Sequence, residues 1–206
     1  MSNLGVGGKF WMAWVLVCIG GGFASFILGL IVFTRNQNVL STVVGLSIVG
    51  ILWGTPQYLL LKNYTAKINI SWILVSVAGI IASLYVAVFI FAVLEKNISW
   101  ALIGATGATF QYLVLRQHFS WSIVWIIANG VSVTVSRHIG EVVFKVVVKA
   151  IEGHRTGYIG DSGLSALALS LSALVQGLTV SGFIVSIYGT ITGGTLVWLV
   201  HNPSIK

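Results

Sequence analysis

Six apolar stretches, each close to the length that crosses a bilayer, follow one another along this chain with only short polar breaks between them. A spanning helix needs about 20 mostly apolar residues, and it satisfies its backbone polar groups internally because lipid cannot. The predicted spans are Phe10–Phe33, Val39–Leu61, Ile70–Leu94, Ser99–Leu115, Trp121–Ser136 and Val175–Val200. We therefore predict an all-α fold, a polytopic membrane helical bundle of about six transmembrane helices that forms a single domain over residues 1–206.

The scarcity of charge supports this class. Charged residues make up 7% of the 206 residues, against about 25% in an average soluble domain. Such a chain cannot cover its surface with polar side chains, so the lipid bilayer is its first expected partner. The formal net charge of +7 is spread over loops and ends, which favours lipid phosphates over nucleic acid as the anionic partner.

A hexapeptide at the end of the second span returns at the end of the fourth. Gln57 opens the segment Gln-Tyr-Leu-Leu-Leu-Lys, and Gln111 opens the segment Gln-Tyr-Leu-Val-Leu-Arg. Self-similarity of this kind indicates a repeated structural unit. We predict three helix-pair repeats, at approximately 10–61, 70–115 and 121–200.

Small residues precede each of these glutamines at matching distances. The residues at relative positions 0, 4 and 7 are Gly50, Gly54 and Gln57 in the second span, Gly104, Ala108 and Gln111 in the fourth, and Thr190, Gly194 and Val197 in the last. These spacings place the three residues on one helix face. We predict that this face packs closely against a neighbouring helix and that the glutamine makes an interhelical hydrogen bond.

The odd-numbered spans share a weaker pattern, in which a tryptophan is followed four residues later by a small or polar residue. The pairs are Trp14 and Cys18, Trp72 and Ser76, and Trp125 and Asn129. Because these tryptophans lie near the predicted span starts, they also suit the aromatic belt found where membrane helices meet water. Asn129 lies inside a predicted span, where an interhelical hydrogen bond is its expected role.

The third repeat carries an insertion at 137–174. Its first part has charged residues about one helical turn apart among apolar ones, which predicts an amphipathic helix that either lies in the interface or prolongs the fifth span. A glycine-rich loop follows at 153–163. The candidate residues for docking a partner are Lys145, Lys149, Glu152 and Asp161. Residues 164–200 carry no charge, so seven spans are the alternative to six.

The densest polar cluster of the chain comprises Asn129, Arg137, His138 and Glu141. An ionisable side chain indicates a functional site when it lies at membrane depth, whereas an Arg137–Glu141 pair at i, i+4 on an interfacial helix has a purely structural explanation. The sequence contains no metal-site spacing, no phosphate-binding loop and no haem-attachment motif. We predict no catalytic residue, no metal and no enzymatic activity.

The repeated pattern Gly-x-x-x-[Gly/Ala]-x-x-Gln-Tyr-Leu-[Leu/Val]-Leu-[Lys/Arg], followed by a tryptophan-led helix, carries a family resemblance. It resembles small uncharacterised multi-pass proteins, frequent in cyanobacteria and some other bacteria, that have recurring Gln-Trp-Leu-Val-Leu-Arg segments. Tyr58 and Tyr112 stand here in place of the usual tryptophan, and residues 191–199 are similar to the closing helix of that group. The resemblance covers most of the chain except 137–174. It implies this architecture and a photosynthetic source, and it implies no mechanism.

The function expected from these features is that of a non-catalytic integral membrane subunit. It would act as scaffold, anchor or assembly partner of a larger membrane complex, with a photosynthetic complex among the candidates. Its partners would be other membrane subunits or further copies of the chain. The expected location is a bacterial inner membrane or a thylakoid-type membrane, with both termini on the cytoplasmic side by the positive-inside rule.

Two alternatives stay open. The first is a small channel or transporter with a polar pathway lined by Gln57, Gln111 and Asn129. The second is a pigment- or lipid-binding membrane protein. Chlorophyll or another pigment would be the cofactor in that case, with a glutamine or a histidine such as His138 as its ligand; no cofactor is predicted otherwise.

Overall fold

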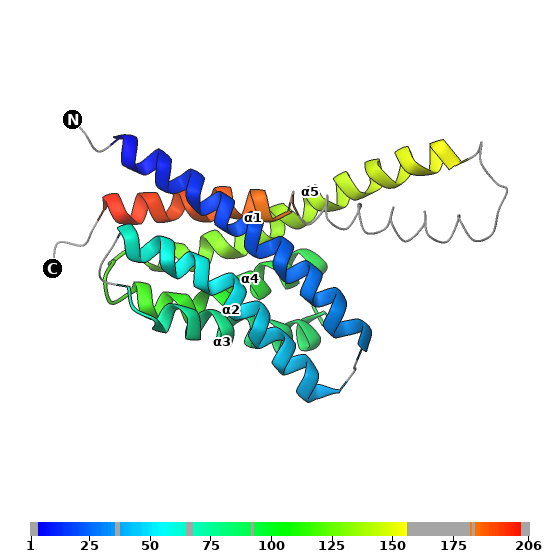
Figure 1. Ribbon diagram of the computed structural model, residues 1–206, viewed down its shortest axis with the longest axis horizontal. Helices are drawn as coiled ribbons and strands as arrows, with labels where there is room; N and C mark the ends of the chain where they lie inside the picture. The colour runs from blue at the N-terminus through cyan, green and yellow to red at the C-terminus, as the bar shows by residue number, and fades with distance from the viewer. Residues whose placement is uncertain are drawn as a thin grey trace.

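The computed structural model describes residues 4–35, 38–64, 68–91, 93–155, 182 and 184–202 (Figure 1). All the regular structure in these residues is helical, so the predicted all-α class is confirmed for this part of the chain. The helices are α1 (Leu4–Arg35), α2 (Val39–Tyr64), α3 (Ser71–Ile90), α4 (Lys96–Leu115), α5 (Ile123–Arg155) and a C-terminal helix at Ile184–His201.

Five of these helices are long and apolar enough to cross a membrane. The apolar segments are Gly7–Ser25, Leu40–Tyr64, Ser71–Ile90, Ile98–Leu115 and Ile184–His201. Large apolar side chains cover the outside of the bundle; Leu16, Leu74 and Val88, for example, are each about two-thirds exposed. An outer surface of this kind is stable in lipid and unfavourable in water. The chain is a membrane-embedded, multi-pass protein.

Helix α5 is longer than the predicted fifth span. It runs from Ile123 to Arg155 without interruption, and its second half projects well beyond the other helices (Figure 1). The amphipathic segment predicted after Ser136 is therefore a prolongation of α5, which was one of the two arrangements that the sequence allowed. The predicted glycine-rich loop and the candidate seventh span lie mostly outside the described residues.

The described helices close into a ring. Helices α1 to α5 pack in chain order, each against the next. The C-terminal helix fills the gap between α5 and α1. On the α5 side, the aromatic rings of Trp198 and of Trp121, just before α5, lie 6.4 Å apart. On the α1 side, the indole N–H of Trp11 donates to the backbone oxygen of Thr190 at 3.1 Å. The first residues of α1 and the last residues of the C-terminal helix lie at the same end of the bundle (Figure 1).

Glycines set the spacing between several neighbours in the ring. A Cβ atom on Gly50 of α2 would lie 2.7 Å from the Cα atom of Val77 in α3. A Cβ atom on Gly104 of α4 would lie 2.7 Å from the backbone oxygen of Asn129 in α5. Both distances are shorter than any normal carbon contact, so only glycine permits these two approaches.

Three tryptophans fill the centre of the ring. Trp14, Trp72 and Trp125 are 0% exposed, and the ring of Trp125 lies 6.1 Å from that of Trp14 and 6.2 Å from that of Trp72. Aromatic pairs at such distances contribute roughly 0.5–1.5 kcal/mol beyond the area they bury. The expectation that these three residues belong to an aromatic belt is wrong, because their helices turn them toward the core rather than toward lipid. We call them the tryptophan cluster.

Candidate functional site

A layer of buried polar side chains lies next to the tryptophan cluster. Each tryptophan is followed one turn later by Cys18, Ser76 or Asn129, and these residues are between 1% and 3% exposed. The facing helices add further buried polar groups, Gln57 at 1%, Gln111 at 6% and Thr192 at 0% exposed. Polar atoms buried in a membrane protein need partners, so their hydrogen bonds define the geometry of the layer.

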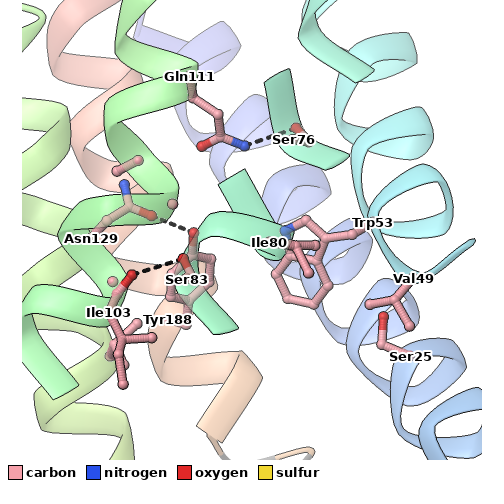
Figure 2. Close-up of a pocket in the computed structure, with 14 residues that line it drawn as sticks. Ser25, Val49, Trp53, Ser76, Ile80, Ser83, Ile103, Gln111, Asn129 and Tyr188 are labelled. Atoms are coloured by element: carbon pink, nitrogen blue, oxygen red, sulfur yellow. Dashed lines mark hydrogen bonds between the residues drawn. The ribbon is translucent and has the colours of Figure 1, made fainter. Parts of the chain in front are cut away.

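Gln111 of α4 joins three helices. Its Nε2 atom donates to Oγ of Ser76 in α3 at 3.0 Å (Figure 2), and its Oε1 atom accepts from the indole N–H of Trp125 in α5 at 3.0 Å. An indole nitrogen can only donate, so this bond also fixes which end of the amide faces Trp125. All the heavy polar atoms of the Gln111 side chain are thereby engaged.

Gln57 of α2 makes a similar contact on one side only. Its Nε2 atom lies 3.8 Å from Sγ of Cys18 in α1. Within the described part of the chain, neither Oε1 of Gln57 nor the indole N–H of Trp72 has a hydrogen-bond partner. The third indole of the cluster, that of Trp14, donates to Oγ1 of Thr192 at 3.0 Å.

Asn129 of α5 is held between its own helix and the C-terminal helix. Its Nδ2 atom donates to the backbone oxygen of Trp125 at 2.8 Å, and its Oδ1 atom accepts from the hydroxyl of Tyr188 (Figure 2). Asn129 therefore cross-links α5 to the helix that closes the ring.

A cavity of about 330 Å³ lies inside the ring beside this layer (Figure 2). All six helices line it: Ser25 comes from α1, Trp53 from α2, Ser76, Ile80 and Ser83 from α3, Gln111 from α4, Asn129 from α5 and Tyr188 from the C-terminal helix. In α1, α3 and α5 every lining residue follows the tryptophan of its helix by one turn or more. The cavity therefore lies on one side of the tryptophan cluster, toward the C-terminal ends of α1 and α3.

A second cavity of about 320 Å³ adjoins the first. The two share Trp53, Val133 and Tyr188 as lining residues, and the rings of Trp53 and Tyr188 lie 5.8 Å apart. The second cavity is further lined by Trp100 and Arg137, among others. Together the cavities extend from the polar layer toward the level at which α5 becomes charged.

Arg137 is neutralised where it reaches the second cavity. Its guanidinium forms an ion pair with Glu141 one turn later, and it lies over the ring of Trp100, 4.7 Å from the ring centre. The hydrogen bond and the positive charge of Arg137 hold the pKa of Glu141 below its usual value. The i, i+4 pair expected from the sequence is present. The positive charge of Arg137 at the second cavity is therefore balanced by the negative charge of Glu141.

Two buried hydroxyls next to the cavities have no hydrogen-bond partner among the described residues. Oγ of Ser25 belongs to a residue that lines the first cavity and Oγ of Ser136 to one that lines the second. A serine inside a helix commonly bonds the carbonyl four residues earlier, as Ser47 and Ser76 do here at 2.8 Å. Ser25 and Ser136 are therefore free to bond a molecule in the cavities.

The sequence-predicted site residues fall into several groups. Gln111 and Asn129 meet at the first cavity, and Arg137 reaches the second, whereas Gln57 is buried outside both linings. His138 is exposed and lines neither cavity. Within the residues described, no group of three or more histidine, cysteine or acidic side chains could hold a metal ion.

The packing residues predicted in the last span need a correction. Gly194 is exposed, with no atom of the described residues within 4 Å of where its Cβ atom would lie, and Thr190 is exposed as well. The close contacts with α1 come instead from Gly189, whose Cβ atom would lie 3.0 Å from Cβ of Cys18, and from Gly193. The prediction is wrong for Gly194 because the repeat spacing selected Thr190 and Gly194, and both lie on the lipid-facing side of this helix.

The predicted docking residues are only partly described. Lys145 and Lys149 are exposed and belong to the second half of α5, the half that projects beyond the other helices (Figure 1). Glu152 lies near the end of α5, and Asp161 lies outside the described residues.

Sequence reasoning missed Thr192 and Tyr188 altogether. A signal for Thr192 exists: Leu196 follows it by four residues and is buried, as Leu61 follows Gln57 and Leu115 follows Gln111. Tyr188 offers no such signal, because its partner Asn129 lies 59 positions away in the sequence.

No protein-family model matches the chain, and no curated protein or solved structure is significantly similar to it. The fold and the site by themselves define the class: a multi-pass helical membrane protein with a cavity lined by its described helices.

Proposed function

We propose that this protein is a non-catalytic membrane protein that binds a small lipid-soluble molecule inside its ring of helices. The observation that carries the proposal is the cavity of about 330 Å³ to which all six helices contribute. Ligand sites typically measure about 300–1,000 Å³ and combine apolar walls with a few convergent polar groups. Apolar side chains such as Val49, Ile80 and Ile103, with the polar groups of Gln111 and Tyr188, meet that description.

We further infer that six helices span the membrane and that they form three repeated pairs: α1 with α2, α3 with α4, and α5 with the C-terminal helix. Three matching sets of buried residues support this inference. They are Trp14, Trp72 and Trp125; Cys18, Ser76 and Asn129; and Leu61, Leu115 and Leu196. In this scheme the third counterpart of Gln57 and Gln111 is Thr192 rather than Val197.

Binding is favoured over conduction by the tryptophan cluster. The three indoles and the buried leucines Leu61, Leu115 and Leu196 occupy the centre of the ring on one side of the cavity. A continuous polar path that includes Gln57, Gln111 and Asn129 would have to pass this cluster. A channel or transporter would therefore need a large rearrangement of the core, whereas a binding site needs none.

The test is to fill the cavity and measure what the protein carries. Ile80→Trp places a large side chain into the first cavity, and Leu74→Trp, on the lipid-facing side of the same helix, is its matched control. The proteins are purified in mild detergent, and bound small molecules are extracted and quantified by mass spectrometry and visible absorbance. We expect Ile80→Trp to lose a molecule that the wild type and Leu74→Trp retain. Equal contents in all three folded proteins would refute the proposal.

The second candidate is the subunit role expected from the sequence, with a neighbouring membrane protein as partner. One observation favours it: α5 continues beyond the ring as far as Arg155 (Figure 1). Deletion of residues 139–163 should then release the partner while the far-ultraviolet circular dichroism of the bundle is preserved. Retention of every co-purified protein would count against this role.

We propose a bacterial inner or thylakoid-type membrane as the location, with both termini cytoplasmic.

A further inference from the structure

We infer that the bound molecule is a neutral amphiphile whose polar end carries a hydroxyl or carbonyl oxygen, and that Ser25 and Ser136 bind that oxygen. The inference rests on the proposed ligand-binding function. It names the class of ligand and the side chains that recognise it, neither of which follows from the presence of a cavity alone.

The two amides that line the first cavity already have hydrogen-bond partners. Gln111 bonds Ser76 and Trp125, and Asn129 bonds Trp125 and Tyr188. A ligand that bonded either amide would have to share an atom that already bonds another part of the ring. The amides therefore serve first to hold the ring together, and a hydroxyl without a partner is the more available group for a ligand.

Two serine hydroxyls differ from the amides in this respect. Oγ of Ser25 and Oγ of Ser136 are buried, lack partners among the described residues and belong to residues that line the two adjoining cavities. A hydroxyl can donate one hydrogen bond and accept others. The two serines can therefore satisfy an oxygen that is itself a donor, an acceptor or both.

The two serines occupy matching positions in their helices. Ser25, Ser83 and Ser136 each follow the tryptophan of their helix by 11 residues, which is close to three full turns and roughly 16 Å along a helix axis. Each serine therefore lies on the same inward face as its tryptophan. Ser83 also lines the first cavity, although its hydroxyl already donates to the backbone oxygen of Ile103 at 3.0 Å (Figure 2). Three hydroxyls thus mark the end of the cavity region that lies away from the tryptophan cluster.

The described lining of the cavities does not suit a charged ligand group. Among the described residues that line them, Arg137 is the one that carries a charge, and it is already paired with Glu141 and stacked on Trp100. An ion buried among apolar walls without a free counter-charge is strongly unfavourable. A neutral head group at the serines and an apolar body between Trp53, Ile80 and Val133 satisfy both the polar and the apolar surfaces of the site.

The experiment uses four probes with the same 11-carbon chain and a terminal bromine, which quenches tryptophan fluorescence. The heads are a hydroxyl, a carboxylate, an ammonium and a plain methyl group. Each probe is titrated into the purified full-length protein in detergent, and the saturable part of the quenching is measured. We expect the hydroxyl probe to bind most tightly, with Trp53 among the quenched residues.

The variants separate the serines from the cavity. Ser25→Ala and Ser136→Ala should each weaken binding of the hydroxyl probe by about two- to tenfold, the usual effect of one neutral hydrogen bond. Ser132→Ala is the matched control, because Ser132 lies one turn earlier in α5 and its hydroxyl bonds the backbone oxygen of Ala128. It should bind the hydroxyl probe like the wild type.

The outcomes distinguish this inference from the function on which it rests. If a charged probe binds most tightly, or if Ser25→Ala and Ser136→Ala together leave binding unchanged while Ile80→Trp abolishes it, the assigned ligand class is wrong and the binding function stands. If no probe shows saturable binding and no molecule co-purifies with the protein, the binding function itself fails.

Discussion

The indole N–H of Trp125 in α5 donates a hydrogen bond to Oε1 of Gln111 in α4, at 3.0 Å. The opposite end of the same amide bonds Ser76 in α3, so one side chain links three consecutive helices of the ring. Trp125 and Gln111 are 0% and 6% exposed, and an unpaired polar group at such a position is unfavourable. This pair therefore fixes the orientation of the tryptophan cluster relative to the cavity.

The first prediction concerns the Gln111 side chain. Gln111→Leu should lower the free energy of unfolding by about 1–3 kcal/mol, because it leaves the buried indole N–H of Trp125 and the hydroxyl of Ser76 without this partner. Gln117→Leu, at an exposed position shortly after α4, is the control and should have little effect. Thermal unfolding in detergent measures both variants. Similar stabilities of the two would show that the buried network contributes little.

The second prediction compares two tryptophans of the same cluster. Trp125→Phe removes a bonded N–H and leaves Oε1 of Gln111 unpaired, whereas Trp72→Phe removes an N–H that has no partner among the described residues. Both changes remove the same volume from fully buried sites. Trp125→Phe should therefore be more destabilising by about 1 kcal/mol, the net value of a typical hydrogen bond. Equal losses in parallel unfolding curves would contradict the difference in bonding.

These contacts mark the limit of what the sequence could predict. Apolar runs predict the helices well, since Val39–Leu61 became α2 (Val39–Tyr64) and Ser99–Leu115 became α4 (Lys96–Leu115). Run length does not say which face of a helix turns inward, so Trp14, Trp72 and Trp125 suited a membrane interface as well as a core. The partners of Gln111 and Asn129 depend on helices brought together by the ring, and no local pattern specifies them.

The third prediction tests the packing faces of two glycines. Gly50→Ala brings a methyl group to within 2.7 Å of the Cα atom of Val77, so α2 and α3 must separate, and a loss of about 1–3 kcal/mol is expected from such overpacking. The methyl group of Gly194→Ala meets no atom of the described helices, so this change should be neutral or stabilising by up to about 1 kcal/mol, because alanine favours helix. Unfolding midpoints of the purified variants measure both effects. A destabilised Gly194→Ala would restore the packing role expected from the sequence.

The fourth prediction tests whether α5 crosses the membrane. Single cysteines at Ser120 and Lys149, introduced in a Cys18→Ser background, lie on either side of the apolar part of α5. If six helices span the bilayer, a membrane-impermeant maleimide added outside sealed vesicles should label one site and spare the other. Asn63→Cys should label from the same side as Ser120→Cys. Labelling of Ser120→Cys and Lys149→Cys from the same side would exclude a crossing by α5.

The claim that the ring encloses a ligand is tested most directly by native mass spectrometry of the wild-type protein, released from detergent under gentle conditions. The account predicts one adduct of a few hundred daltons per 22.0 kDa chain, within the drug-sized range that such cavities hold. The adduct should be present in Leu74→Trp and absent from Ile80→Trp. A bare chain in all three proteins, or an adduct that Ile80→Trp retains in full, would contradict the account.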